Sequence, residues 1–414
     1  MIEYKVINDS VVEEESSLYA GGSLFVSSLR KSDSAVRISR LIRGNWTSTT
    51  LRTAAASDIH DAPNIAVGPD GYIYAVSETH GSQVYDVPVY RSDEPYGITF
   101  TQVSTISVDN YFKYPDIVFD DSGTLWLFHI TGEQTRYIVY RKSNDGGETW
   151  FDTTTLWDSA NGDGDIPYFT VHYTDGEILI TTSSDNSRDD MTSGCYFMKH
   201  DGTSWKKADG TEYTLPVTKT TADVAFNPAT AGGSAGFGIR AQKDSSGRYF
   251  CIVPRLSEVE DEFAGVYLCR YDSGWSQTLI DADMNSSSVA VRSNGLYEFI
   301  GTKKISSVAQ LARWTSENDG EFWYSEVLTS GSLNRERDFI RHIEKVPSRL
   351  FVIYEALDRV SNFTWNADAY LLFSALTNRF QFAKGGWAEQ AAKSIASSAW
   401  GSSTVKRSVG GAWQ

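Results

Sequence analysis

The sequence predicts an all-β fold assembled from a repeated four-stranded unit. Three features of the 414 residues support this prediction: 13% are aromatic, 33 are glycine, and most of the chain lacks a long apolar stripe at helical spacing. Aromatic side chains pack well on sheet faces, and glycines allow the tight turns between short strands. A chain of this length can bury a sizeable core, because repetitive β folds grow by adding units.

A turn followed by an aromatic residue recurs seven times, at intervals of 48 to 70 residues. The signals are Gly44–Trp46, Gly97–Phe100, Ser143–Trp150, Gly202–Trp205, Gly274–Trp275, Ser316–Trp323 and, more weakly, Asn378–Phe380. Self-similarity at such a period is typical of a closed array of similar sheets.

A second repeat, a hairpin of strand, turn and strand, lies between the aromatic signals. Its turns are rich in Asp, Ser, Gly and Pro, which favour tight reversals. We expect these hairpins at residues 24–42, 61–77, 115–128, 168–182, 237–254, 287–302 and 339–354. Each of these inner hairpins is followed by an outer hairpin that carries the aromatic turn, which gives seven units of four strands. Residues 1–383 are therefore predicted to form a closed seven-bladed β-propeller.

The two ends of the chain differ from the repeat. Residues 4–12 are expected to add a strand that closes the ring. From Lys384 the composition changes to Ala, Ser, Gly and Trp. Residues 384–414 are therefore predicted to be a short C-terminal tail, with a helix at 388–400 or a docking segment that supports oligomerisation. The last ten residues resemble the Lys/Gly/Trp-containing endings of phage tail proteins.

The charge and the cysteines exclude several classes of function. A net charge of −16 and a pI near 4.8 disfavour nucleic acid and acidic membranes as partners. The first residues lack the pattern of a signal peptide, and no run of about 18 apolar residues occurs. Cys195, Cys251 and Cys269 are widely spaced, so we expect buried free thiols. No cofactor and no metal ligand set is predicted, and a structural metal is left open.

Two histidines bracket the second inner hairpin. Its turn is Gly68–Gly71, in which Pro and Gly provide the backbone angles of a tight reversal. Antiparallel pairing about this turn places His60 opposite His80. We therefore expect the two histidines at the same open end of the hairpin, close enough to share a ligand.

The same reasoning gathers further polar residues at the open ends of the other inner hairpins. These ends line one mouth of a propeller, where ligands bind. The candidates are Tyr114, His129, Tyr168, Arg255, Lys303, Arg335 and Arg337. The sequence thus predicts a basic, tyrosine-rich pocket in an acidic protein.

Two segments resemble motifs of known propeller families. Ser143–Trp150 matches the S-x-D-x-G-x-T-W Asp box of sialidase-like β-propellers, and Ser316–Trp323 keeps the spacing with Asn318 at the Asp position. In such a box the Asp accepts bonds from turn amides and the Trp packs between sheets. The box is a structural device that favours a propeller and carries no chemistry.

A wider resemblance, over most of residues 20 to 330, is to the BNR-type propellers of the ulvan lyase families. It rests on His60-x-x-Pro63-x-Ile65-x-x-x-x-Asp70-Gly71, Thr79-His80-Gly81, Tyr114-Pro115, Tyr140-Arg141-Lys142, Lys207–Thr211 and Leu215–Val217. Those enzymes cleave a sulfated algal polysaccharide by β-elimination beside a uronic acid. The reaction needs a base for the C5 proton, an acid for the leaving O4, and groups that neutralise the C6 carboxylate.

The resemblance implies roles for three residues. One histidine is the base, with His80 favoured over His60, and Tyr114 is the acid or proton shuttle; the other histidine contacts the carboxylate or a subsite. A neutral histidine can accept a proton near pH 7. Where the family usually has an arginine facing Tyr114, this chain has His129. The carboxylate must then be neutralised by His129 itself or by Arg255, Arg335 or Arg337.

The leading hypothesis is therefore a polysaccharide lyase acting on a uronate-containing, ulvan-like glycan. Such a function implies an extracellular or virion-associated location, although no signal peptide is recognised. One alternative is a phage tail or receptor-binding propeller that recognises or depolymerises a glycan. The other is a sialidase-like glycoside hydrolase, which would use an arginine triad and a Tyr/Glu pair; no such pair is found at the hairpin ends.

Overall fold

The computed structural model describes most of the chain. The described residues are 2–7, 10–11, 17–30, 32–42, 45–54, 61–77, 86–108, 111–132, 135–159, 166–185, 193–236, 239–256, 263–282, 284–291, 297–305, 308–328, 336–342, 351–361, 364–373, 406–409 and 412–413. The strands, contacts and exposed fractions that follow belong to these residues.

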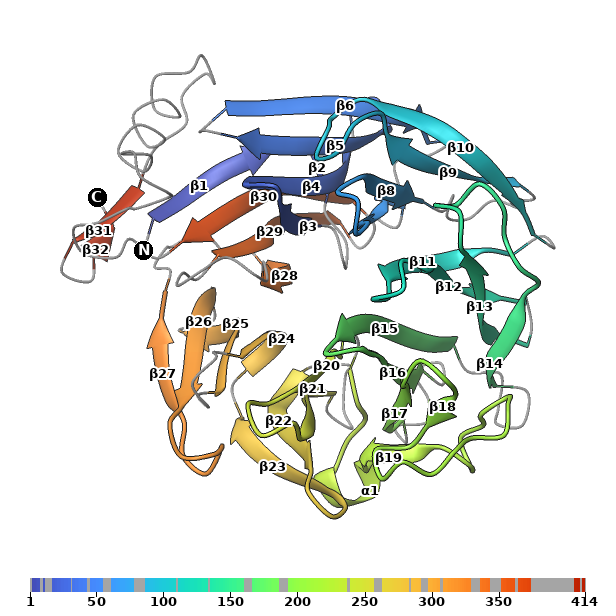
Figure 1. The fold of residues 1–414 in the computed structure, drawn as a ribbon. Helices are drawn as coiled ribbons and strands as arrows, with labels where there is room; N and C mark the ends of the chain where they lie inside the picture. The colour runs from blue at the N-terminus through green and yellow to red at the C-terminus, as the bar shows by residue number, and fades with distance from the viewer. Residues whose placement is uncertain are drawn as a thin grey trace.

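The described strands form seven antiparallel sheets that follow one another around a ring (Figure 1). The prediction of an all-β propeller is thereby confirmed. The first strand of each sheet lies toward the centre of the ring and the last lies at its rim. Short strands joined by tight turns produce this arrangement, because each sheet buries both faces against its neighbours.

Strands that are close in the sequence form each sheet, except that the seventh also includes the N-terminal strand. The first three sheets contain β2 (Ser10–Val11), β3 (Ser17–Ala20), β4 (Ser23–Arg30), β5 (Ala35–Ile42) and β6 (Asn45–Thr53); β7 (Asn64–Val67), β8 (Ile73–Val76), β9 (Asp86–Ser92) and β10 (Phe100–Ser107); and β11 (Lys113–Phe119), β12 (Leu125–Thr131), β13 (Tyr137–Ser143) and β14 (Thr154–Asp158). The fourth and fifth contain β15 (Ile166–Thr174), β16 (Glu177–Asp185), β17 (Cys195–His200), β18 (Trp205–Lys206) and β19 (Asp223–Phe226); and β20 (Ala241–Lys243), β21 (Tyr249–Leu256), β22 (Phe263–Tyr271) and β23 (Trp275–Asp281). The last two contain β24 (Met284–Val291), β25 (Tyr297–Ile305), β26 (Val308–Ser316) and β27 (Tyr324–Val327); and β28 (Glu336–His342), β29 (Phe351–Ser361), β30 (Thr364–Phe373), β1 (Ile2–Ile7), β31 (Lys406–Val409) and β32 (Ala412–Trp413). The helix α1 spans Pro228–Ala231.

The N-terminal strand closes the ring. β1 pairs antiparallel with β30, so the seventh sheet combines the two ends of the chain. An N-terminal closing strand was expected at residues 4–12, and the observed strand is Ile2–Ile7. β31 pairs with the other edge of β1, so part of the tail extends this sheet. The helix expected at 388–400 lies outside the described residues.

The first sheet corrects one sequence expectation. Residues 24–42 were expected to form an inner hairpin, but β4 and β5 are the second and third strands of their sheet. The inner hairpin is β3–β4, which turns at Gly21 and Gly22. Both glycines have positive φ (55° and 76°), which glycine adopts without steric cost. The strand before this turn was not recognised because it has four residues and follows the acidic run Glu13–Glu15.

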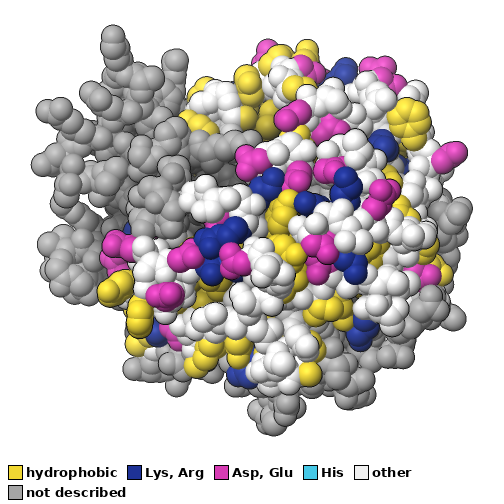
Figure 2. Space-filling view, turned by 60° about the horizontal axis from the view of Figure 1, so that its bottom comes forward, with side chains coloured by type: hydrophobic (Ala, Val, Ile, Leu, Met, Phe, Trp, Pro, Cys, Tyr) yellow, Lys and Arg dark blue, Asp and Glu magenta, His cyan; other side chains and the backbone are white. Residues whose placement is uncertain are grey.

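The surface mixes both signs of charge. On the face presented in Figure 2, Lys and Arg side chains lie close to Asp and Glu side chains and form no continuous basic field. This distribution agrees with the net charge of −16. No helix among the described residues has the length and apolar character needed to cross a membrane.

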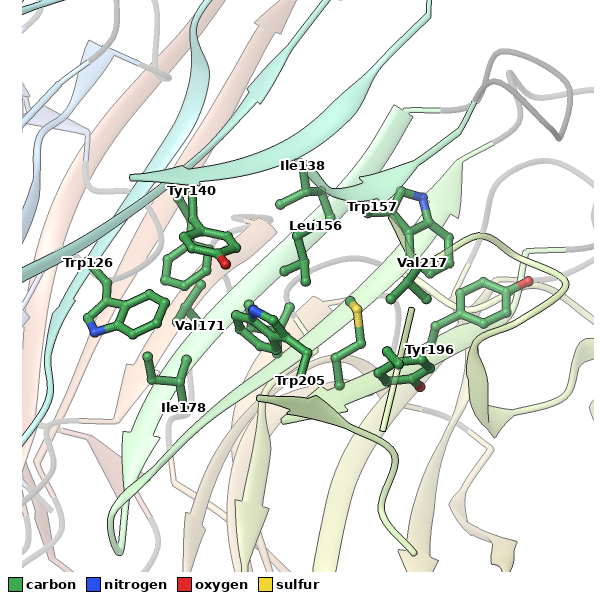
Figure 3. Packing of buried hydrophobic residues seen from close by; sticks show 14 residues of the cluster. Trp126, Ile138, Tyr140, Leu156, Trp157, Val171, Ile178, Tyr196, Trp205 and Val217 are labelled. Atoms are coloured by element: carbon green, nitrogen blue, oxygen red, sulfur yellow. The ribbon is translucent and has the colours of Figure 1, made fainter. Parts of the chain in front are cut away.

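The core lies between neighbouring sheets. Figure 3 shows one cluster, in which Trp126, Ile138 and Trp157 of the third sheet meet Val171 and Trp205 of the fourth. Full burial of an aromatic or branched side chain contributes about 1.5–3 kcal/mol. Such contacts between sheets hold each blade at a set angle to the next, and thereby position the strand ends that form the mouth.

The two octapeptide turns, Ser143–Trp150 and Ser316–Trp323, share one hydrogen-bond scheme. The Asp145 carboxylate accepts a bond from the Thr149 amide at 2.9 Å, and the Asn318 carboxamide oxygen accepts the equivalent bond at 3.0 Å. The tryptophan that ends each turn donates its indole N–H to the glycine carbonyl three residues earlier, at 3.1 and 3.0 Å. These bonds fix the backbone of the two outer turns.

The three cysteines are free and buried, as expected from their spacing. Cys251 and Cys269 are cross-strand partners in the fifth sheet, and all three belong to one hydrophobic cluster. They are therefore part of the core.

Candidate functional site

The site is built around Tyr114, which occupies an unusual backbone position. It has a φ of 51°, in the left-handed region that side chains other than glycine rarely adopt. The pairing of β11 with β12 shifts register between Lys113 and Asp116, so Tyr114 and Pro115 form a bulge. Bulges often redirect a side chain beside a functional site. The sequence pattern placed Tyr114 at this strand end but gave no sign of the bulge.

Tyr168 joins Tyr114 from the next sheet. The two rings meet edge to face, with centroids 5.2 Å apart, and both side chains are partly exposed. Tyr168 lies near the start of β15, opposite Ser183, one residue from the expected partner Thr182. The structure thus brings together two predicted site residues that are 54 positions apart in the sequence.

Bonds between inner strands hold this end of the sheets in place. The Asp116 carboxylate accepts the Val171 backbone N–H at 2.9 Å, and the Asn64 side chain accepts the Ile117 N–H at 3.3 Å. Asp116 and Asn64 are 6% exposed. A buried carboxylate that accepts a backbone N–H forms a strong, directional link. Tyr114 therefore stands on a rigid frame that joins three consecutive sheets.

Four predicted site residues cannot be compared with the structure. His60, His80 and Arg335 lie outside the described residues, and Arg337 lies in β28, whose side chains are not described. The hairpin between the two histidines pairs Asn64 with Val76 and Val67 with Ile73, which is the register expected from its turn. The roles of these four residues remain predictions.

His129 is buried, which corrects the expectation that it contacts substrate. Its side chain is 2% exposed and its ring lies 4.4 Å from that of Phe112. Nδ1 lies 3.3 Å from the Ile130 carbonyl, and Nε2 has no hydrogen-bond partner among the described residues. Burial lowers the pKa of His129 to about 3, with a smaller contribution from the positive charge of Arg141. A neutral, buried imidazole cannot neutralise a substrate carboxylate at pH 7.

Two other predicted cations have partners within the protein. Arg255 donates to the carbonyls of Ala231 and Gly232 at 2.9 and 2.8 Å, where α1 ends. The Lys303 ammonium lies 2.7 Å from the Asp281 carboxylate. Basic side chains commonly bond to the last carbonyls of a helix, as Arg255 does at the end of α1. Binding of substrate by Arg255 or Lys303 would require these contacts to be exchanged.

Sequence reasoning missed a group of cationic and aromatic residues at the same end of the third sheet. The Lys113 ammonium and the Arg136 guanidinium lie 5.8 and 5.9 Å from the ring centroid of Tyr111. Tyr111 precedes β11, and Arg136 lies in the connection between β12 and β13. The available signal was positional: both segments lead into strand ends that the hairpin rule assigns to the mouth.

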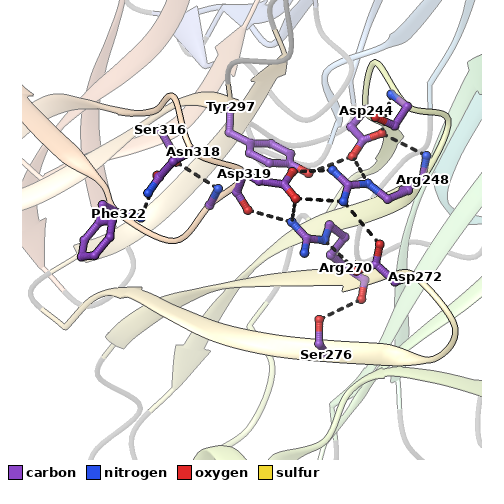
Figure 4. A network of polar contacts seen from close by, with 12 residues as sticks. Asp244, Arg248, Arg270, Asp272, Ser276, Tyr297, Ser316, Asn318, Asp319 and Phe322 are labelled. Atoms are coloured by element: carbon purple, nitrogen blue, oxygen red, sulfur yellow. Dashed lines mark hydrogen bonds and ion pairs between the residues drawn. The ribbon is translucent and has the colours of Figure 1, made fainter.

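The opposite end of the sheets holds a different kind of arginine cluster. Arg248, in the turn between β20 and β21, bonds to the carboxylates of Asp244 and Asp319 (Figure 4). Arg270 lies 3.1 Å from Asp319. The bond with Asp319, more than any other contact, raises the pKa of Arg248. These ion pairs tie the turns of the fifth and sixth sheets together and leave the arginines engaged.

Comparison with known proteins identifies the family. A model described as BNR repeat-containing family member matches residues 24–282. An anhydrosialidase of Macrobdella decora is 27% identical over 163 residues, which are 33% of this chain and 21% of that protein. The chain thus spans about a fifth of the length of this curated relative.

Two solved structures have a similar fold. One is an ulvan lyase of polysaccharide lyase family PL25 bound to -[GlcA(1-4)Rha3S]-, with a TM-score of 0.75 and 17% identity over 90% of this chain and 97% of that one. The other is the polysaccharide lyase Uly1, with a TM-score of 0.65 and 14% identity over 87% and 89%. At these identities the likeness establishes the fold.

Proposed function

This chain belongs to the BNR repeat-containing family, and we propose that it is a polysaccharide lyase that cleaves a uronate-containing, ulvan-like glycan by β-elimination. The observation that carries the proposal is Tyr114, a partly exposed phenol in a left-handed conformation at the open end of the β11–β12 hairpin. Strained backbone of this kind persists where the surrounding structure enforces it, often at active sites. Similarity in fold to carbohydrate-active propellers, two of them polysaccharide lyases, supports the same conclusion.

The proposed mechanism assigns a proton transfer to each of two groups. His80, or His60 in its place, removes the C5 proton of the uronate. The C4–O4 bond then breaks, and Tyr114 donates its phenolic proton to the departing O4. Tyr168 packs against the Tyr114 ring and holds it in position. A positioned acid or base of this kind contributes about 10²–10⁴-fold to rate.

The test is product formation from a panel of acidic polysaccharides. A lyase releases a 4,5-unsaturated uronate, whose ultraviolet absorbance increases as the reaction proceeds. Tyr114→Phe should lower turnover by at least about 100-fold, because the phenyl ring keeps the packing but cannot donate a proton. Its midpoint of thermal unfolding should match that of the unmodified chain. If none of the polysaccharides gives an unsaturated product, the proposal is wrong.

A matched control removes a hydroxyl in β15 of the neighbouring fourth sheet, at the end opposite to Tyr114. The Tyr173 hydroxyl accepts a bond from the Asp121 amide at 2.8 Å, beside the hairpin turn of β11 and β12. Tyr173→Phe should leave turnover unchanged. An equal loss of activity in both variants would mean that the Tyr114 effect is structural.

A sialidase-like hydrolase is the second candidate, and the partial match to an anhydrosialidase favours it. A fluorogenic sialoside distinguishes the two, since a lyase of uronates does not release its fluorophore. Fluorophore release together with no unsaturated product would replace the first proposal by the second. Binding of glycan with neither product would indicate a recognition propeller.

A further inference from the structure

We propose that Arg136, held against Tyr111, binds an anionic oxygen group of the substrate beside Tyr114. The inference rests on the proposed function, because it assigns a cation that β-elimination requires. The ligand group is a carboxylate or a sulfate, both of which present two oxygens to a guanidinium fork.

Three other predicted site residues at this end of the propeller are not available as free cations. His129 is neutral and buried, Arg255 is bonded to backbone carbonyls, and Lys303 is paired with Asp281. Arg136 differs: in the part of the chain that the structure describes, its side chain has the Tyr111 ring as its contact and no carboxylate partner. It is partly exposed, so a ligand can reach it.

The location of Arg136 follows from the register of the third sheet. Lys113 pairs with Ile130 and Thr131 pairs with Tyr137, so the connection that carries Arg136 lies at the same end of the sheet as Tyr114. The Ser159 amide donates to the Arg136 carbonyl at 3.3 Å and anchors this connection to the end of β14. Gly132 has a φ of 88° and lies so close to the Thr135 carbonyl that a side chain there would clash. The backbone around Arg136 is therefore constrained.

The electrostatic setting favours an anion here. A net charge of −16 repels an anionic glycan at long range, so binding requires a local group of positive charges. The Lys113 ammonium also lies within 6 Å of the Tyr111 ring centroid, but Lys113 is 5% exposed and has other partners. The partly exposed Arg136 is therefore the charge beside this ring that a ligand can reach. The ring contact orients the guanidinium plane, which reduces the entropy lost when a ligand binds.

The experiment measures the dissociation constants of three oligosaccharides by calorimetry: a sulfated glucuronate-containing one, its desulfated form and its carboxyl-reduced form. Arg136→Gln should weaken binding of the first by about 10- to 100-fold, the effect of one charge-assisted hydrogen-bond pair. The dissociation constant of the Arg136→Lys variant for this oligosaccharide should lie between those of Arg136→Gln and the unmodified chain. If Arg136 binds the carboxylate, the variant and the unmodified chain should bind the carboxyl-reduced sugar equally. If it binds sulfate, they should bind the desulfated sugar equally.

The control is Arg91→Gln. The Arg91 guanidinium lies 5.4 Å from the ring centroid of Tyr72, a similar pairing of arginine and tyrosine beside the hairpin turn at the opposite end of a sheet. Its removal should leave all three dissociation constants unchanged. Equal affinities for Arg136→Gln and the unmodified chain would overturn the inference, as would the absence of binding of every sugar by the unmodified chain. If Arg136→Gln binds the sugars as tightly as the unmodified chain and still releases unsaturated product, this inference is wrong and the proposed function stands.

Discussion

Replacing Tyr114 by glycine should give a more stable protein than replacing it by alanine, the reverse of the usual order. Both substitutions remove the ring and its contact with Tyr168 equally, so their difference isolates the backbone. At a φ of 51° a Cβ atom costs about 1–2 kcal/mol. Glycine avoids this cost, but its greater conformational freedom in the unfolded chain destabilises the folded protein by about 0.4–1 kcal/mol. The expected difference is about 1 kcal/mol in favour of glycine.

Urea unfolding at 25 °C measures this difference from the two midpoints. Tyr168 provides the matched control, because it makes the other half of the ring contact and is not among the described residues with positive φ. The Tyr168→Ala variant should be more stable than the Tyr168→Gly variant by about 0.5–1 kcal/mol. If Tyr114→Ala proves as stable as Tyr114→Gly, the left-handed conformation is refuted, and with it the structural argument for the site.

Three further predictions concern the scaffold. The pKa of Asp145 is lowered to about 2, first by the bond from the Thr149 hydroxyl, so its stabilisation is present above about pH 4 and lost as the pH falls toward 2. The stability difference between the unmodified chain and Asp145→Ala, measured by urea unfolding, should therefore shrink from pH 5 to pH 2; a constant difference would contradict this. Phe299→Ala should cost about 3–5 kcal/mol in the same assay, since the ring is 1% exposed and stacks on Trp314. Deleting residues 1–9 removes β1 from the seventh sheet and should lower the thermal midpoint, and an unchanged midpoint would show that ring closure by β1 adds no stability.

The repeat and most hairpin registers could be predicted because their signals are local. A turn such as Gly68–Gly71 determines its own backbone angles, and the alternation of side chains then determines which residues face each other. The observed pairing of Lys113 with Ile130 and of Glu336 with Leu357 follows from this rule. The rule failed in the first sheet, where an inner strand of four residues after an acidic run was missed.

The site was less accessible to sequence reasoning. A hairpin rule places a residue at a strand end, but it does not say whether the side chain turns inward or outward. His129 was correctly placed at its strand end, and yet the packing of Phe112 buries it. Lys303 likewise lies where expected, but a carboxylate from the neighbouring sheet engages it. Arg136 was missed because it lies in a connection between strands.

The sequence by itself determined the all-β repeat, the turns and the strand pairing within most of the sheets, because these depend on residues a few positions apart. Tertiary structure alone decided which side chains from different sheets meet. The contact of Tyr114 with Tyr168, the burial of His129 and the position of Arg136 over Tyr111 depend on how the sheets and their connections pack around the ring. Such packing is a property of the whole ring and has no local signature in the chain.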